Sequence, residues 1–267
     1  MFDKEILRTI VLGIVQGITE FLPISSDGHL VVVQSLLKLW LGAPSAAGEV
    51  SDLHYDVVLH IGTLGSIVVV YWRDLWELRR NWKLCGLIVL ATIPAGIVGV
   101  ALKSSVEEAF HSPLAAGVGL LFTAGILLAG QRWAREERDL DLITPRDAAL
   151  IGLMQALAIA PGVSRSGSTI STALGCGIKR GAAATFSFLM AVPVIAGAAV
   201  LALKDIVTGE AIAGRSDVLF VGAATSFVVG WVALRWLLAM LSRGRFHWFA
   251  CYCLAAGTAV IAWQCLS

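Results

Sequence analysis

Two stretches of polar sequence lie inside long apolar runs, Gln16–His29 (QGITEFLPISSDGH) and Gln155–Ser168 (QALAIAPGVSRSGS). They begin 139 positions apart, and they align without a gap. The matched pairs are Gly13 with Gly152, Gln16 with Gln155, Ser25 with Ser164, Gly28 with Gly167, and the unlike pairs Ser26 with Arg165 and Asp27 with Ser166. The repeat therefore predicts a duplicated chain.

The composition predicts an all-α polytopic membrane protein. Hydrophobic residues make up 57% of the 267 and charged residues 15%, with a mean hydropathy of +0.81, which lies outside the range of soluble domains. In such a chain a loop of serines, glycines and prolines cannot face lipid, because its unsatisfied backbone groups are costly there. Both polar stretches are expected to line an enclosed or wet cavity, where the function should reside.

Several other classes are excluded. The net charge of +1 gives no basic excess for a nucleic-acid partner. The five cysteines have neither metal-ligand nor redox spacing, so no disulfide is expected. The first apolar segment carries Gln16 and Glu20 and lacks a cleavage site of small residues, so we expect it to stay in the mature protein.

Six apolar runs are long enough to cross a bilayer, which takes about 20 residues. They cover about 55–72, 84–102, 113–131, 182–203, 217–241 and 247–264. Two further runs are broken by the polar stretches, into 6–22 with 29–41 and into 148–160 with 168–178. Each half is too short to cross alone, so each pair is interpreted as a re-entrant helical hairpin.

The charges test this arrangement. If the hairpins do not cross, one side of the membrane holds twelve basic residues and the other holds six. The twelve are Arg73, Arg79, Arg80, Lys83, Arg132, Arg135, Arg138, Arg146, Lys179, Arg180, Arg243 and Arg245; the six are Lys4, Arg8, Lys38, Lys103, Lys204 and Arg215. The positive-inside rule then places both termini outside the cytoplasm.

Each half of the chain has one hairpin followed by three spans, and three is odd. The second half must start from the opposite face, which predicts an inverted-topology repeat whose hairpin tips meet near the midplane. Weaker similarity at an offset of 131 supports this, between Arg73-Asp74 and Lys204-Asp205. We expect one integral membrane domain, 1–267, with repeat halves of about 1–131 and 132–267.

The first polar stretch carries the candidate catalytic groups. Gln16 and Glu20 are four apart and share a helix face, and a carboxylate within a membrane segment marks a site by default, although a glutamate at a wet helix end is the alternative. Serine needs a base, and His29 is near enough in sequence to serve Ser26 or to attack phosphorus itself. Asp27 either joins Glu20 in binding metal or caps the half-helix near His29.

The second polar stretch is suited to an anion. Arg165 lies too deep in its apolar region to snorkel easily, and its planar, permanently charged guanidinium suits a buried phosphate. Backbone amides after Gly162 and Gly167, at a half-helix start, would add an anion cradle. The stretch is not a P-loop, because no lysine follows the second glycine. Oxygen atoms of Gln16 and Glu20 suit a divalent metal that bridges diphosphate oxygens.

At these residues the chain closely resembles the undecaprenyl-diphosphate phosphatase family, also called the bacitracin-resistance phosphatases. The motifs are Gln16-x-x-x-Glu20 with the run to His29, then Tyr55–Thr63 (YDVVLHIGT) and Pro161–Gly167 (PGVSRSG). The resemblance implies a hydrolase that converts undecaprenyl diphosphate to the monophosphate carrier reused in cell-wall synthesis. It also implies a divalent metal, magnesium or else calcium, and a multi-pass protein of the bacterial inner membrane with a periplasm-facing site.

Carried over by this resemblance, the roles fall on specific residues. The expected catalytic residues are Glu20, Ser26, His29 and Arg165; the expected substrate-binding residues are Ser25, Asp27, Gly28, Ser164, Ser166, Gly167, Ser168 and Thr169; the expected metal ligands are Gln16 and Glu20. The family usually has serine or threonine where this chain has Asp27. The sequence does not distinguish a monomer from a homodimer. The alternative function is a lipid-phosphate transporter or flippase, since inverted repeats with broken helices are common in transporters.

Overall fold

The computed structural model describes residues 4–41, 52–102, 109, 112–207, 216–244 and 246–266. Its main helices are α1 (Lys4–Phe21), α2 (Ser26–Leu41), α3 (Asp52–Val70), α4 (Trp72–Leu78), α5 (Trp82–Ala101), α7 (Pro113–Trp133), α8 (Pro145–Leu157), α9 (Arg165–Gly175), α10 (Arg180–Val207), α11 (Ser216–Ser242) and α12 (His247–Leu266), with a short 3-10 turn, η1 (Leu140–Leu142). Within these ranges the extended structure is limited to one isolated bridge between Arg138 and Ile178. The predicted all-α class is confirmed.

Within these ranges five helices are long and apolar enough to cross a membrane, namely α5, α7, α10, α11 and α12. α3 meets the same criterion only when it is taken together with α4, and the pair bends by 79° at the break. The predicted polytopic membrane protein is thus confirmed. The first predicted span, about 55–72, is followed directly by the short helix α4 and not by a loop. Because α4 carries charged residues and the exposed Trp72 and Trp76, it has the composition of a helix lying at the membrane interface.

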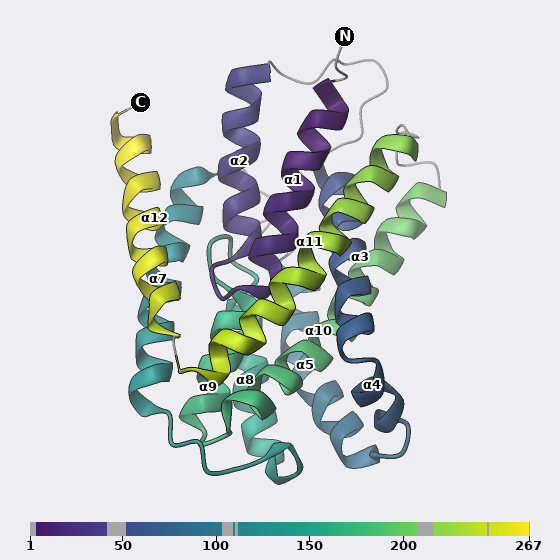
Figure 1. Ribbon diagram of the computed structural model, residues 1–267, viewed down its shortest axis with the longest axis vertical. Coiled ribbons are helices and arrows are strands. Elements are labelled where there is room, and N and C mark those ends of the chain that lie inside the picture. Colours follow the sequence, from purple (N-terminus) through teal and green to yellow (C-terminus); the bar gives the residue numbers. More distant parts are fainter. Residues whose placement is uncertain are drawn as a thin grey trace.

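The two broken segments form helical hairpins that enter the molecule from opposite ends (Figure 1). The first is α1 with α2, and the second is α8 with α9. Both returning helices begin three residues earlier than the sequence suggested, at Ser26 rather than 29 and at Arg165 rather than 168. The chemically interesting residues therefore lie in first helical turns, where backbone geometry fixes their direction.

The entering helix of each hairpin packs against a helix from the other half of the chain. α1 of the first half lies along α11 of the second, and α8 of the second half lies along α5 of the first. A Cβ on Gly13 would lie 3.2 Å from the carbonyl oxygen of Gly222, and one on Gly152 would lie 2.5 Å from that of Ala91. Gly13 and Gly152 are matched in the polar repeat, and Gly222 lies 131 positions after Ala91. Residues that the predicted repeat makes equivalent therefore make equivalent close contacts.

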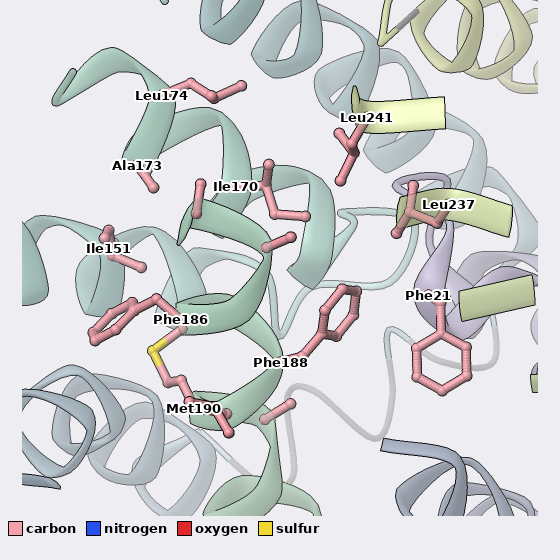
Figure 2. Packing of buried hydrophobic residues seen from close by; sticks show 14 of the residues in the cluster. Phe21, Ile151, Ile170, Ala173, Leu174, Phe186, Phe188, Met190, Leu237 and Leu241 are labelled. Carbon is pink, nitrogen blue, oxygen red and sulfur yellow. The ribbon is translucent and has the colours of Figure 1, made fainter. Parts of the chain in front are cut away.

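The hydrophobic core is centred on α10, which is buried around its whole circumference between Ala183 and Ala191 except near Thr185 (Figure 2). Phe188 packs edge-on against Phe21 at the end of α1, with ring centroids 5.7 Å apart. A helix that is apolar on all sides belongs inside a bundle, and here it supports the ends of both hairpins.

The open ends of the hairpins are tied in different ways. In the first, Lys4 Nζ donates one exposed hydrogen bond to the carbonyl of Leu41. In the second, Arg138 binds both oxygens of Asp147 on α8, at 2.9 and 3.0 Å, and also donates to the carbonyl of Cys176 at the end of α9. Burial alone would raise the pKa of Asp147. The contacts with Arg138 and Thr144 lower it by more than burial raises it, so the pKa lies below its usual value.

Candidate active site

Each hairpin tip is built around a serine that caps the returning helix. Ser25 Oγ accepts from the backbone N–H of Gly28 at 3.3 Å, and Ser164 Oγ accepts from that of Gly167 at 3.0 Å. A serine at this position satisfies one of the free N–H groups of the first turn. The cap of α2 is Ser25 rather than Asp27, so of the two alternatives for Asp27 the capping role is wrong.

The two tips touch through glycine. A Cβ on Gly28 would lie 2.8 Å from the Cα of Gly162, so neither position has room for a side chain. Gly162 also has a φ of +84°, a conformation that L side chains rarely adopt. Thr123 of α7 holds this turn, because its hydroxyl donates to Gly162 O at 2.8 Å and accepts from Ser164 N at 2.9 Å.

The first tip contains a strained residue. Ser25 has a φ of +67°, in the left-handed region that non-glycine residues seldom occupy. Such strain costs about 1–3 kcal/mol and persists only where surrounding contacts impose it, which is common at functional sites. Here the conformation turns the chain sharply after Pro23 and starts α2 with Ser26 pointing back toward α1.

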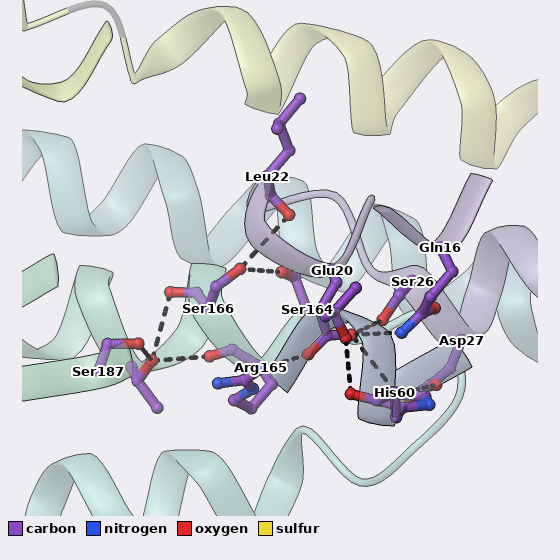
Figure 3. A network of polar contacts seen from close by, with 12 residues as sticks. Gln16, Glu20, Leu22, Ser26, Asp27, His60, Ser164, Arg165, Ser166 and Ser187 are labelled. Carbon is purple, nitrogen blue, oxygen red and sulfur yellow. Dashed lines mark hydrogen bonds and ion pairs between the residues drawn. The ribbon is translucent and has the colours of Figure 1, made fainter. Parts of the chain in front are cut away.

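Glu20 is the centre of a buried polar network (Figure 3). Its side chain is only 5% exposed. One oxygen accepts from Gln16 Nε2 at 3.1 Å and from the Ser26 hydroxyl at 2.7 Å, and the other pairs with Arg165 from the opposite tip. The structure thus brings together four of the residues predicted from sequence, at the contact between the two hairpins.

His60 of α3 also belongs to this site, and the sequence analysis gave it no role. Its Nε2 lies 3.5 Å from the same Glu20 oxygen that accepts from Ser26, and 3.9 Å from Asp27 Oδ1. The imidazole therefore lies between the two carboxylates (Figure 3). The available signal was a histidine in an apolar span, within the Tyr55–Thr63 motif, which marks a candidate site by default.

His29 lies apart from the Glu20 network. Its Nδ1 is 2.7 Å from the carbonyl oxygen of Ser25, and its Nε2 is 2.7 Å from the hydroxyl of Tyr252 on α12. The two rings also stack, with centroids 5.6 Å apart. Both ring nitrogens are therefore engaged, which leaves neither of them to take a proton from Ser26 in this arrangement.

The remaining hydroxyls of the second tip support its shape. Ser166 Oγ lies 3.3 Å from Ser164 Oγ and donates to the carbonyl of Leu22 at 3.4 Å, which joins the two tips. Thr169 Oγ1 donates to the carbonyl of its own helix at Arg165 and contacts a hydroxyl on α10. Ser168 Oγ is buried without a partner within the described residues. No substrate contact by these groups is shown, and their predicted binding role stays a prediction.

Two buried polar atoms of the network are left free. Arg165 Nη1 and Gln16 Oε1 have no hydrogen-bond partner among the described residues. A buried donor of a charged group is costly when it is unpaired, so these two atoms are candidates for ligand contacts. Arg165 Nη1 suits an anionic oxygen, and Gln16 Oε1 suits a cation or a donor.

The predicted metal ligands Gln16 and Glu20 lie side by side, but the described part of the chain contains no group of three His, Cys, Asp or Glu side chains with metal-binding geometry. The donor set nevertheless fits a hard divalent cation, since it offers a carboxylate and a free amide oxygen next to the arginine. Substrate phosphate oxygens supply further ligands in sites of this kind.

The family model described as bacitracin resistance protein BacA matches residues 9–259. The chain belongs to this family. An undecaprenyl-diphosphatase of Rhodopirellula baltica is 42% identical over 97% of this chain and 98% of its own. Proteins of the same name from Korarchaeum cryptofilum and Corynebacterium glutamicum are each 38% identical, over 97% and 96% of this chain and 99% and 89% of theirs. The family resemblance expected from the sequence motifs is thereby confirmed.

Proposed function

We propose that the protein is a membrane phosphatase that hydrolyses undecaprenyl diphosphate to undecaprenyl phosphate and inorganic phosphate. The observation that carries the proposal is the Ser26 hydroxyl, which donates to the buried Glu20 carboxylate at 2.7 Å beside an arginine with a free buried N–H. This is a nucleophile, a base and a phosphate-binding group in one network. The names of the BacA-family relatives support the substrate.

Before substrate binds, Glu20 is committed to an ion pair with Arg165. An incoming diphosphate competes for the guanidinium, because two charged oxygens of a phosphate fit its planar fork. Once Arg165 turns to the phosphate, its ion pair with Glu20 is broken, and the carboxylate is free to take the proton of the Ser26 hydroxyl that it already accepts from. Substrate binding thus activates the base that faces Ser26.

In the first chemical step, Ser26 Oγ attacks the terminal phosphorus while Glu20 takes the hydroxyl proton. The serine–phosphorus bond forms, the bridging phosphorus–oxygen bond breaks, and Glu20 passes its proton to the departing monophosphate. In the second step, Glu20 takes a proton from a water that attacks the phosphoserine. Inorganic phosphate leaves, and the proton returns to Ser26.

We also propose a divalent cation, magnesium or alternatively calcium, held by Glu20 and Gln16 Oε1. Such an ion supplies charge neutralisation of the diphosphate when it is bound. The free amide oxygen of Gln16 supports this assignment. Asp27 Oδ1 lies 3.9 Å from His60 Nε2, next to the Glu20 network, and offers the proposed cation a second carboxylate.

The proposed location is the bacterial inner membrane, with the site facing the periplasm. The basic residues assigned to the cytoplasm belong to the last turn of α7 and to segments that follow α3, α7, α9 and α11 in the chain. Of these segments, α4 and the one between α7 and α8 lie at the end of the molecule opposite to the start of α1 and the end of α12 (Figure 1). Single cysteines in a background without the five native ones test this. Cysteines replacing Arg79 and Arg138 should label only from the cytoplasm; labelling from the periplasm would reverse the orientation.

The rival function, a lipid-phosphate transporter or flippase, is not favoured by the names of the relatives. The deciding experiment uses purified protein in detergent, where no two sides exist, with undecaprenyl diphosphate and magnesium. We expect stoichiometric release of inorganic phosphate. Binding of the lipid without phosphate release would reject the phosphatase and leave the transporter.

A further inference from the structure

A second pocket of a different kind lies at the far end of α9 from Arg165. It has a volume of about 420 Å³ and is lined by Arg132, Trp133, Ala134, Arg135 and Gly175. These residues come from the end of α7, the segment that follows it and the last residue of α9. Since α9 has 11 residues, the pocket lies about 16 Å from the first turn of that helix and is separate from the Glu20 network.

The lining of the pocket carries two positive charges and no negative charge. Arg132 and Arg135 line it without any acidic residue, and neither has an ion-pair partner among the described residues. The neighbouring carboxylates are used elsewhere or do not line the pocket. Glu136 pairs with Arg180, Asp139 with Lys179 and Asp147 with Arg138, while Glu137 and Asp141 lie outside the lining.

The helix end beside the pocket does not oppose an anion as strongly as a bare C-terminus would. The last carbonyls of a helix carry partial negative charge when they are unpaired. Here the carbonyl of Leu174 accepts from Gly177 N, that of Ala173 accepts from Ile178 N, and that of Cys176 accepts from Arg138. The two guanidinium groups therefore dominate the local field.

The position of the pocket indicates which anion it takes. α7 is a membrane-spanning helix, and the pocket begins in its last turn, so it lies at the level of the lipid headgroups. Trp133 is 67% exposed there, as expected of a tryptophan in the interfacial belt. Basic pockets between spanning helices at this depth suit phosphate-bearing headgroups. A soluble phosphate would not need an exposed indole beside it.

We propose that this pocket binds the headgroup phosphate of an anionic glycerophospholipid from the adjacent leaflet. Arg132 and Arg135 contact the phosphate, and Trp133 lies along the glycerol and upper acyl region. Because Gly175 ends the helix whose first residue is Arg165, the bound lipid lies against the foot of the hairpin that carries the phosphate-binding arginine.

Native mass spectrometry of the full chain in detergent tests the proposal, with phosphatidylglycerol and phosphatidylcholine as probes. Wild type should retain phosphatidylglycerol in preference to phosphatidylcholine. Arg132→Gln with Arg135→Gln should weaken phosphatidylglycerol binding about 30-fold, at roughly fivefold for each basic residue lost near an anionic lipid. The matched control is Arg146→Gln with Arg243→Gln, which removes the same charge from exposed arginines outside the pocket and should change binding little.

Further variants and ligands in the same experiment distinguish an anionic lipid from other ligands of the pocket. Arg132→Lys with Arg135→Lys keeps both charges and should stay within about fivefold of wild type; a loss equal to that of the glutamine pair would overturn the electrostatic assignment. Arg165→Ala should leave this binding unchanged. Equal retention of phosphatidylcholine, wild-type binding by the glutamine pair, or displacement of the lipid by inorganic phosphate would each overturn the proposal.

Discussion

The two hairpin tips share one architecture and carry different chemistry. Both have a glutamine on the entering helix, Gln16 or Gln155, and a serine that caps the returning helix. The residue after the cap is Ser26 in one tip and Arg165 in the other. The position of Glu20 is matched by an isoleucine in the second half. In the predicted repeat, one tip thus carries the proposed nucleophile and base, and the other carries the proposed phosphate-binding charge.

The feet of the hairpins differ as well. At the first foot Lys4 donates an exposed bond to Leu41, while at the second the partly buried Arg138 pairs with Asp147 and donates to the carbonyl of Cys176. The second foot thus has a partly buried ion pair, whereas the bond from Lys4 at the first is exposed to solvent.

The largest expected effect comes from the residue after the first cap. Ser26→Ala should lower turnover by roughly 10⁴-fold or more, the scale on which loss of a nucleophile acts. His29→Gln should cost far less, because His29 contacts Ser25 and Tyr252 instead of Ser26. Rapid quench should trap an acid-stable phosphoserine in wild type. An acid-labile adduct that disappears in His29→Gln would assign the nucleophile to the histidine instead.

Glu20→Gln removes the negative charge of the first tip, which the isoleucine at the matched position of the second tip does not have. The side-chain volume is nearly unchanged. Loss of the base should lower kcat by about 10²–10⁴-fold and abolish the response to magnesium. Gln16→Glu is the control, since it adds a carboxylate beside the metal and should keep activity. A normal magnesium titration in purified Glu20→Gln would reject both of its assigned roles.

Arg165→Lys tests whether the second tip needs a fork or only a charge. We expect turnover to fall by about 10²–10³-fold, because a point ammonium does not reproduce a bidentate contact with phosphate. Arg165→Ala should be at least as impaired. Circular dichroism and gel filtration check the fold of both variants. Activity of Arg165→Ala close to wild type would remove the division of labour between the tips.

Asp27→Ser makes the first tip resemble the second, which has Ser166 at the matched position. Since Ser25 already caps α2, we expect the change to act on metal binding, with the magnesium concentration for half-maximal activity rising about tenfold. Ser25→Ala should reduce stability and leave that concentration nearly unchanged. An unaltered requirement in Asp27→Ser would exclude the aspartate from metal binding.

The smallest expected effect separates the two feet. Arg138→Gln should lower the free energy of unfolding by about 2 kcal/mol, as for a lost charged hydrogen bond, whereas Lys4→Gln should change it little. The pKa of Asp147 is lowered in the folded protein, so its stabilisation is present above the usual carboxyl pKa and is lost as pH falls. Thermal melts should show the difference between Arg138→Gln and wild type narrowing below about pH 4. Equal effects of both substitutions would contradict the asymmetry.

The sequence predicted the parts of this architecture that follow from local pattern. The broken apolar runs located both hairpins, and the shared spacing of glutamine, serine and glycine located both tips. It did not predict that α2 and α9 start at Ser26 and Arg165, because the capping contacts of Ser25 and Ser164 depend on a turn that composition does not specify. The helices therefore extended three residues further than expected.

Long-range partners were beyond the reach of sequence reasoning. His29 is 223 positions from Tyr252, so nothing near it in sequence indicated that its ring nitrogens would be engaged. His60 reaches Glu20 from a separate helix, and a lone histidine in an apolar run has no spacing that ties it to a carboxylate. The bend between α3 and α4 comes just before a segment of charged and tryptophan residues, and no local pattern in the apolar run predicted its angle.

The contact between Gly28 and Gly162 has a consequence for ancestry. Two unlinked copies of a single half-length chain, inserted in opposite orientations, would present the same residue at both tips and so would offer two serines or two arginines. Two copies fused within one chain diverge independently, so that one tip carries a hydroxyl, Ser26, while the other carries a guanidinium, Arg165. The fusion also fixes the stoichiometry at one of each, so that every molecule inherits a complete reaction centre from a single translation product.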